Sequence, residues 1–141
     1  MRNILILCTG NSCRSVLAEA YINHVSDEWR AFSAGSQPSG EVHPLAIETL
    51  ESSGIDANYT RSKSWNEFAC ADAPVMDVIV TVCDNAAGET CPVWPGHPTT
   101  YHWPFSDPAK FSGSDDDIRA HFREVFAMIK QRMDNFLTNK G

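Results

Sequence analysis

The sequence has no apolar run of the roughly 20 residues that a membrane-spanning helix needs. Its first apolar stretch, residues 4–7, is too short for the core of a secretory signal peptide. Basic residues are also scarce: 11 lysines and arginines stand against 18 acidic residues, a formal net charge of −7. Nucleic acids and anionic membranes attract basic surfaces, so we expect neither as a partner. We therefore expect a cytoplasmic protein.

The chain also lacks internal repeats, low-complexity tracts and linkers, so its 141 residues are expected to form one domain over 1–141. Short apolar runs predict strands at 3–7, 30–34, 77–83 and 99–103. Apolar residues at helical spacing predict helices at 12–24, 44–53, 64–71 and 115–137. This alternation predicts an α/β fold, in which helices flank both faces of a four-stranded parallel sheet.

Cysteines are present in an odd number, and no secretion signal accompanies them, so a structural disulfide framework is not expected. In a reducing compartment, clustered cysteines indicate redox chemistry, metal binding or nucleophilic catalysis. The sequence assigns no partner to Cys70, which we expect to be partly buried. The five are Cys8, Cys13, Cys70, Cys83 and Cys91.

The run Cys-Thr-Gly-Asn-Ser-Cys-Arg-Ser, residues 8–15, lies between the first predicted strand and the first predicted helix. Ligands of open parallel sheets bind at this edge. Main-chain N–H groups there can surround an anion, and the helix N-terminus adds positive potential. Gly10 allows a close or left-handed backbone turn, and the fork of Arg14 can bind two oxygens. The expected anion-binding residues are Thr9, Gly10, Asn11, Ser12, Cys13 and Arg14.

The same positive field favours the thiolate of Cys8, which is the nucleophilic form of cysteine. Ser15 can donate its hydroxyl to this sulfur, and Asn11 can fix the loop by bonding to nearby backbone groups. We expect the Cys13 side chain to pack away from the anion. The alternative, a small buried cysteine at a strand end, does not explain why Gly, Asn, Ser and Arg accompany it. The loop predicts attack by a thiolate on a tetrahedral oxyanion.

Residues 8–15 resemble the signature of the low-molecular-weight protein tyrosine phosphatase fold, which is Cys, five residues, Arg and Ser. Asp107-Pro108 matches the Asp-Pro pair that supplies the general acid in that family, and the chain length and final helix fit as well. The resemblance implies that Asp107 protonates the departing oxygen. Residues 109–111 lack the tyrosine pair that holds a phenyl ring in tyrosine phosphatases, but such a phosphatase stays the alternative, and weak phosphatase activity is plausible.

Two further cysteines favour a reductase, because reduction needs a second thiol and preferably a third. Cys83 ends the third predicted strand, and Cys91 follows after seven residues. With the loop, this pattern resembles the arsenate reductases built on the phosphatase fold. The resemblance implies that Cys8 attacks arsenate, Cys83 attacks Cys8 to release arsenite, and Cys91 attacks Cys83, as in arsenic detoxification. We expect a monomer without a bound cofactor.

The electron donor stays open, because the spacing from Cys83 to Cys91 is one residue longer than is usual in the family. A thioredoxin-like or a glutaredoxin-like partner, the latter with glutathione, would serve as the external thiol reductant. The pair also leaves an alternative, in which Cys83, Cys91, His97 and His102 bind zinc. Their spacings differ from those of compact zinc fingers, which disfavours this reading.

Some members of the family bind potassium beside the loop. The positions match Asn11, Glu19, Ser33 and a later acidic residue, for which this chain has Lys63. A lysine ammonium there would take the place of the ion and neutralise Glu19, so we expect no potassium requirement. The alternative is an ordinary solvated lysine, the usual state of this residue type.

Overall fold

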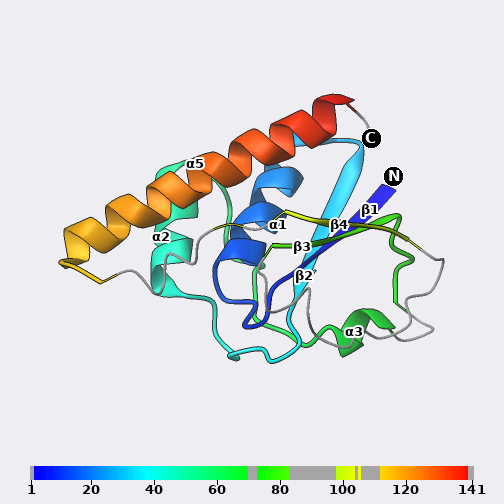
Figure 1. Cartoon of the computed structure of the whole chain (residues 1–141), viewed down its shortest axis with the longest axis horizontal. Coiled ribbons are helices and arrows are strands. Elements are labelled where there is room, and N and C mark those ends of the chain that lie inside the picture. Colours follow the sequence, from blue (N-terminus) through cyan, green and yellow to red (C-terminus); the bar gives the residue numbers. More distant parts are fainter. Residues whose placement is uncertain (1, 70–72, 83–97, 104, 106–111, 140–141) are drawn as a thin grey trace.

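The computed structural model describes residues 2–69, 73–82, 98–103, 105 and 112–139 (Figure 1). Every strand and helix expected from the sequence is present, with bounds that differ by a few residues. The strands are β1 (Arg2–Leu7), β2 (Trp29–Ala34), β3 (Val78–Thr81) and β4 (Thr99–His102). The helices are α1 (Arg14–Val25), α2 (Pro44–Ser52), α3 (Asn66–Ala69) and α5 (Asp115–Asn139). Residues 84–97 of the expected loop lie outside the described residues.

The four strands form one parallel sheet in the order β2-β1-β3-β4, which confirms the predicted fold class. β1 lies inside the sheet, and its residues Ile4–Leu7 are at most 1% exposed. This burial explains why β1 is apolar on both faces rather than alternating. Leu7 pairs with Ala34 of β2 on one side and with Thr81 of β3 on the other. The carboxyl ends of three strands therefore meet at one edge.

Helices cover both faces of the sheet. Figure 1 shows α5 above α1 and α2, with α3 on the opposite side of the strands. Ile4 and Ile6 pack in the cluster that includes α1 and α5, whereas Leu5 and Leu7 pack with Trp65 and Phe68. Successive side chains of a strand point to opposite faces, so β1 supplies both cores.

Helix α1 is buried around most of its circumference, because β1, β2, α2 and α5 all pack against it. Val25, at the C-terminal end of the helix, is 46% exposed. Within the described residues, no helix combines the length and the apolar character needed to cross a bilayer.

Candidate active site

The loop of residues 8–13 begins where β1 ends. The Cys8 N–H donates to the Ala34 carbonyl at 3.1 Å, which continues the pairing of β1 with β2 by one residue. Helix α1 then begins at Arg14, with Cys13 as its N-cap residue, and the Cys13 side chain does not cap it. The loop therefore joins a strand end to a helix N-terminus, where the helix dipole favours a bound anion.

Loop carbonyl groups point outward, toward the chain that surrounds the loop. Because the C=O and the following N–H of a trans peptide point in opposite directions, the N–H groups of Gly10, Asn11 and Cys13 face the inside of the loop. Successive inward N–H groups form a concave site for an anion. The outward bonds run to Thr9 O from Gln37 N (3.0 Å), to Gly10 O from Ser39 N (3.0 Å) and Ser62 Oγ (3.0 Å), and to Ser12 O from His43 N (2.8 Å).

The left-handed turn of the loop falls on Asn11, whose φ is 48°. Gly10, the residue expected to supply it, has no positive φ, and a Cβ there would meet only Ser12 Oγ, at 3.7 Å. Asparagine tolerates the left-handed region better than most residues, particularly when its side chain is held by hydrogen bonds. The buried Asn11 amide donates to Ser15 Oγ at 2.8 Å and to Ser33 Oγ at 3.0 Å.

Gly35, which the sequence did not mark as a site residue, also shapes the loop. A Cβ on Gly35, directly after β2, would lie 2.4 Å from Thr9 O and 2.7 Å from Cys8 O. Real Cβ atoms essentially never approach so closely, so the loop has its present position only because residue 35 has no side chain. A glycine next to a predicted strand end was the only signal in the sequence.

Arg14 links the loop to the chain beyond β4. Its Nη1 donates to the Phe105 carbonyl at 3.1 Å, and Phe105 N donates to the Val82 carbonyl at 3.1 Å. Val82 N in turn donates to the Leu7 carbonyl at 2.9 Å. These bonds bring together Leu7, Val82 and Phe105. In the sequence, Leu7 precedes Cys8, Val82 precedes Cys83, and Phe105 lies two positions before Asp107.

Cys83, Cys91, Asp107, Cys70 and His97 lie outside the described residues, so their predicted roles stay predictions. The zinc alternative is equally untested, since only one of its four residues is described.

Both cysteines of the loop are buried. Cys8 is 4% exposed and Cys13 is 3% exposed, and both belong to the buried core cluster that includes Val16 and Leu17. That the Cys13 side chain turns away from the anion stays a prediction.

Two buried charges lie beside the loop, Glu19 at 5% exposure and Lys63 at 7%. Burial raises the pKa of Glu19, while the positive charge of Lys63 and the hydrogen bond from Ser33 oppose the rise. Burial lowers the pKa of Lys63, and attraction to Glu19 opposes that shift. Lys63 is therefore not an ordinary solvated lysine, because it is buried and electrostatically coupled to a carboxylate.

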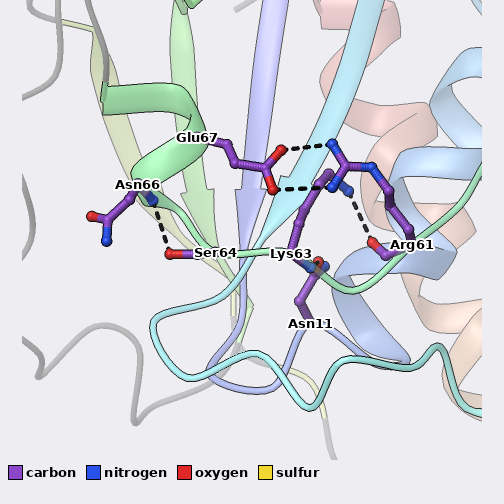
Figure 2. A network of polar contacts seen from close by, with 6 residues as sticks. All are labelled: Asn11, Arg61, Lys63, Ser64, Asn66 and Glu67. Atoms are coloured by element: carbon purple, nitrogen blue, oxygen red, sulfur yellow. Dashed lines mark hydrogen bonds and ion pairs between the residues drawn. The ribbon is translucent and has the colours of Figure 1, made fainter.

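These residues do not fit a potassium ion. Lys63 already brings a positive charge to Glu19, and its Nζ donates to the Arg61 carbonyl at 3.0 Å. The Lys63 main-chain N–H donates to Asn11 Oδ1 at 2.8 Å, so a lysine holds the position next to the loop. Figure 2 shows this arrangement, in which Arg61 is also bound by both carboxylate oxygens of Glu67, at 3.0 and 2.6 Å.

Residues 3–140 match the family described as low molecular weight phosphotyrosine protein phosphatase. The chain therefore belongs to this family. Curated relatives include arsenate reductases of Bacillus licheniformis (37% identity over 96% of this chain and 94% of the relative) and of Halalkalibacterium halodurans (39% identity over 94% and 93%). A solved structure described as an arsenate reductase in the phosphate binding state superposes with a TM-score of 0.79, at 29% identity, over 99% of this chain and 98% of that one.

Proposed function

We propose that this protein reduces arsenate to arsenite, with Cys8 as the nucleophile. The observation that carries the proposal is that the carbonyls of Thr9, Gly10 and Ser12 bond outward, from which we infer that the N–H groups of Gly10, Asn11 and Cys13 face inward. Such a site fits a tetrahedral oxyanion beside the Cys8 sulfur. Near-complete coverage by arsenate reductases, together with Cys83 and Cys91, favours arsenate over a phosphoryl ester.

The first step forms a bond between sulfur and arsenic. The Cys8 thiolate attacks arsenate, and one arsenate hydroxyl takes a proton from Asp107 and leaves as water. Arg14 and the inward N–H groups stabilise the negative charge on the remaining oxygens. Support for Asp107 is its closeness in sequence to Phe105, whose carbonyl binds the Arg14 guanidinium.

The next steps move two electrons to arsenic. The Cys83 thiolate attacks the Cys8 sulfur, a Cys8–Cys83 disulfide forms, and the electron pair of the sulfur–arsenic bond stays on arsenic, which leaves as arsenite. Cys91 then attacks Cys83 and frees the Cys8 thiolate. An external dithiol reduces the resulting Cys83–Cys91 disulfide. The bond from Val82 N to the Leu7 carbonyl supports this order, because it joins the chain positions that precede Cys83 and Cys8.

The experiment is arsenate-dependent NADPH consumption, measured in parallel with a thioredoxin system and with glutathione and glutaredoxin. Cys8→Ser should abolish turnover, whereas Cys83→Ser should form the arsenic adduct and release no arsenite. Cys91→Ser should allow at most one turnover with a thioredoxin-type donor. Normal cycling of both Cys83→Ser and Cys91→Ser would contradict the cysteine cascade. Hydrolysis of p-nitrophenyl phosphate by a wild-type chain that shows no arsenate-dependent NADPH consumption would instead establish the phosphatase alternative.

We also infer that residues 1–141 act as one domain, as a cytoplasmic monomer with no bound cofactor. A buried core cluster that draws residues from β1, α1, β2, α2, β3 and α5 supports the single domain. Size-exclusion chromatography with light scattering tests the monomer, and a stoichiometric metal in protein purified without chelator would contradict the redox roles of Cys83 and Cys91.

A further inference from the structure

His43 connects the anion-binding loop to helix α2. Its main-chain N–H donates to the Ser12 carbonyl at 2.8 Å, and its side chain is the N-cap of α2. The Nδ1 atom accepts from Leu45 N at 3.1 Å, and the ring lies against Phe122 of α5, with the two ring centroids 5.0 Å apart. One residue therefore holds both a carbonyl of the loop and the first turn of a helix.

The residues around His43 make this cap necessary. Pro44, the first residue of α2, has no N–H, and Ala46 N donates to the His43 carbonyl at 3.0 Å. The Leu45 N–H is therefore left for the side chain of residue 43 to bind. Pro44 also restricts the residue before it to extended backbone, in agreement with a φ of −61° and a ψ of 131° at His43. The helix thus cannot replace a lost cap by beginning one residue earlier.

The cap requires a neutral imidazole. A main-chain N–H only donates, so Nδ1 of His43 must present its lone pair to Leu45, and the ring hydrogen is on Nε2. A proton on Nδ1 would set two donors against each other, and the added charge would lie at the positive end of the α2 dipole. Histidine is the side chain that ordinarily changes its charge between pH 5 and 8. Acid therefore turns the ring away from Leu45 and removes the cap.

The elements that pack around His43 carry other charged groups, which must be separated from it in any pH dependence. Closest along the chain to the groups that His43 contacts are Arg14, Glu41, Glu48, Arg119, His121 and Arg123. Arg14 donates to the Phe105 carbonyl, and Arg119 binds Glu48 at 2.9 Å. Of these groups, only His121 also changes its charge between pH 5 and 8 as a residue type. His121 therefore provides the matched control.

We propose that His43 is a positioning residue for the Cys13 N–H in the anion site, and that protonation of His43 weakens anion binding in acid. The Ser12 carbonyl and the Cys13 N–H belong to one planar peptide unit, so the bond from His43 N that holds the carbonyl outward also directs the N–H inward. Without the cap, Leu45 no longer fixes residue 43, and this peptide unit is free to turn. The inference rests on the proposed function, which makes the loop an anion site.

The test measures how tightly the loop binds inorganic phosphate between pH 5 and 8. Bound phosphate shields Cys8 from iodoacetamide, so mass spectrometry of the Cys8 peptide in the full chain gives the dissociation constant. His43→Asn is the decisive variant, because an asparagine oxygen caps a helix without titrating. The wild type and His43→Asn should bind equally at pH 8. At pH 5 the wild type should bind about fivefold more weakly, the factor that a cap typically contributes to an equilibrium constant.

Two further variants separate the cap from other effects of acid. His43→Ala lacks the cap at every pH, so it should bind phosphate about fivefold more weakly than His43→Asn throughout. His121→Asn should keep the pH dependence of the wild type. Phosphate changes its own charge over this range, but the ratio of two variants at one pH cancels that change.

Equal binding by the wild type and His43→Asn at both pH 5 and pH 8 would overturn the proposal. Loss of the pH dependence in His121→Asn would also overturn it, because the responsible proton would then lie on α5. The comparison of the wild type with His43→Asn decides the question even if His43→Ala does not fold.

Failure of this inference is distinguishable from failure of the proposed function, because phosphate binding needs neither arsenate nor Cys83 and Cys91. A pH-dependent ratio in a protein that does not reduce arsenate would contradict the reductase and leave the role of His43 standing. Arsenate reduction by a protein whose phosphate binding is the same in His43→Asn at every pH would contradict the role of His43 alone. A wild type that phosphate does not shield would contradict the anion site, and both proposals with it.

Discussion

Replacing Gly35 with alanine should disturb the anion-binding loop more than any neighbouring change of the same size. The new Cβ would lie 2.4 Å from Thr9 O and 2.7 Å from Cys8 O, whereas ordinary contacts begin at 3.4 Å. Neither oxygen belongs to a flexible side chain, so the backbone of the loop or of residue 35 must move by about 1 Å. Hydrogen bonds hold Gly35 on both sides, from its N to the Lys63 carbonyl and from Trp65 N to its carbonyl, each at 2.9 Å. We therefore expect the loop backbone at Cys8 and Thr9, rather than residue 35, to move.

Two magnitudes follow from this displacement. Overpacking of a buried site costs about 1–3 kcal/mol of unfolding free energy. A displacement of about 1 Å in the groups that position a substrate lowers the rate roughly 100-fold. We therefore expect Gly35→Ala to lose about 2 kcal/mol in urea unfolding and about two orders of magnitude in kcat/KM for arsenate.

Gly54→Ala is the control for the cost of the backbone alone. Gly54 has a φ of 76°, and a Cβ there would meet nothing within 4 Å. This variant should lose about 1 kcal/mol of stability through backbone strain and retain its kcat/KM. The reasoning fails if Gly35→Ala retains full activity, or if its loss of activity disappears once both variants are compared at equal stability.

Further predictions concern charges and protonation. Arsenate turnover should be the same in potassium, sodium and choline chloride, because Lys63 supplies the charge that faces Glu19; a potassium-dependent KM would refute this. Lys63→Met should lose about 3 kcal/mol by leaving Glu19 buried and unpaired, whereas Glu19→Met/Lys63→Met should recover much of that loss in chemical unfolding. Burial and the hydrogen bond to Asp134 raise the pKa of Tyr21 to about 12, so the folded state keeps a proton that the unfolded state loses near pH 10. The stability that the raised Tyr21 pKa provides is complete below about pH 10 and is lost as the pH rises toward 12. In urea titrations at successive pH values, Tyr21→Phe should therefore lose less stability between pH 10 and 12 than the wild type does.

Local patterns in the chain were enough to predict the sheet and the position of the site. Apolar runs and helical spacing report burial directly, which explains why β1, β2, α2 and α5 begin and end within a few residues of their expected bounds. The order Cys8, Arg14, Ser15 between a strand and a helix likewise indicated an anion site before any contact was known. Those inferences needed only neighbouring residues.

Contacts between distant parts of the chain were decided by the tertiary structure alone. Gly35 is required because β2 brings it against Cys8 and Thr9, and no pattern around residue 35 reports that approach. The left-handed residue is Asn11 rather than Gly10, since its amide is held by Ser15 of α1, by Ser33 of β2 and by Lys63 between α2 and α3. The sequence by itself determined which residues form the loop, whereas the packing around the loop determined which way its carbonyls and the Asn11 amide point, because these groups bond to residues far away in the sequence.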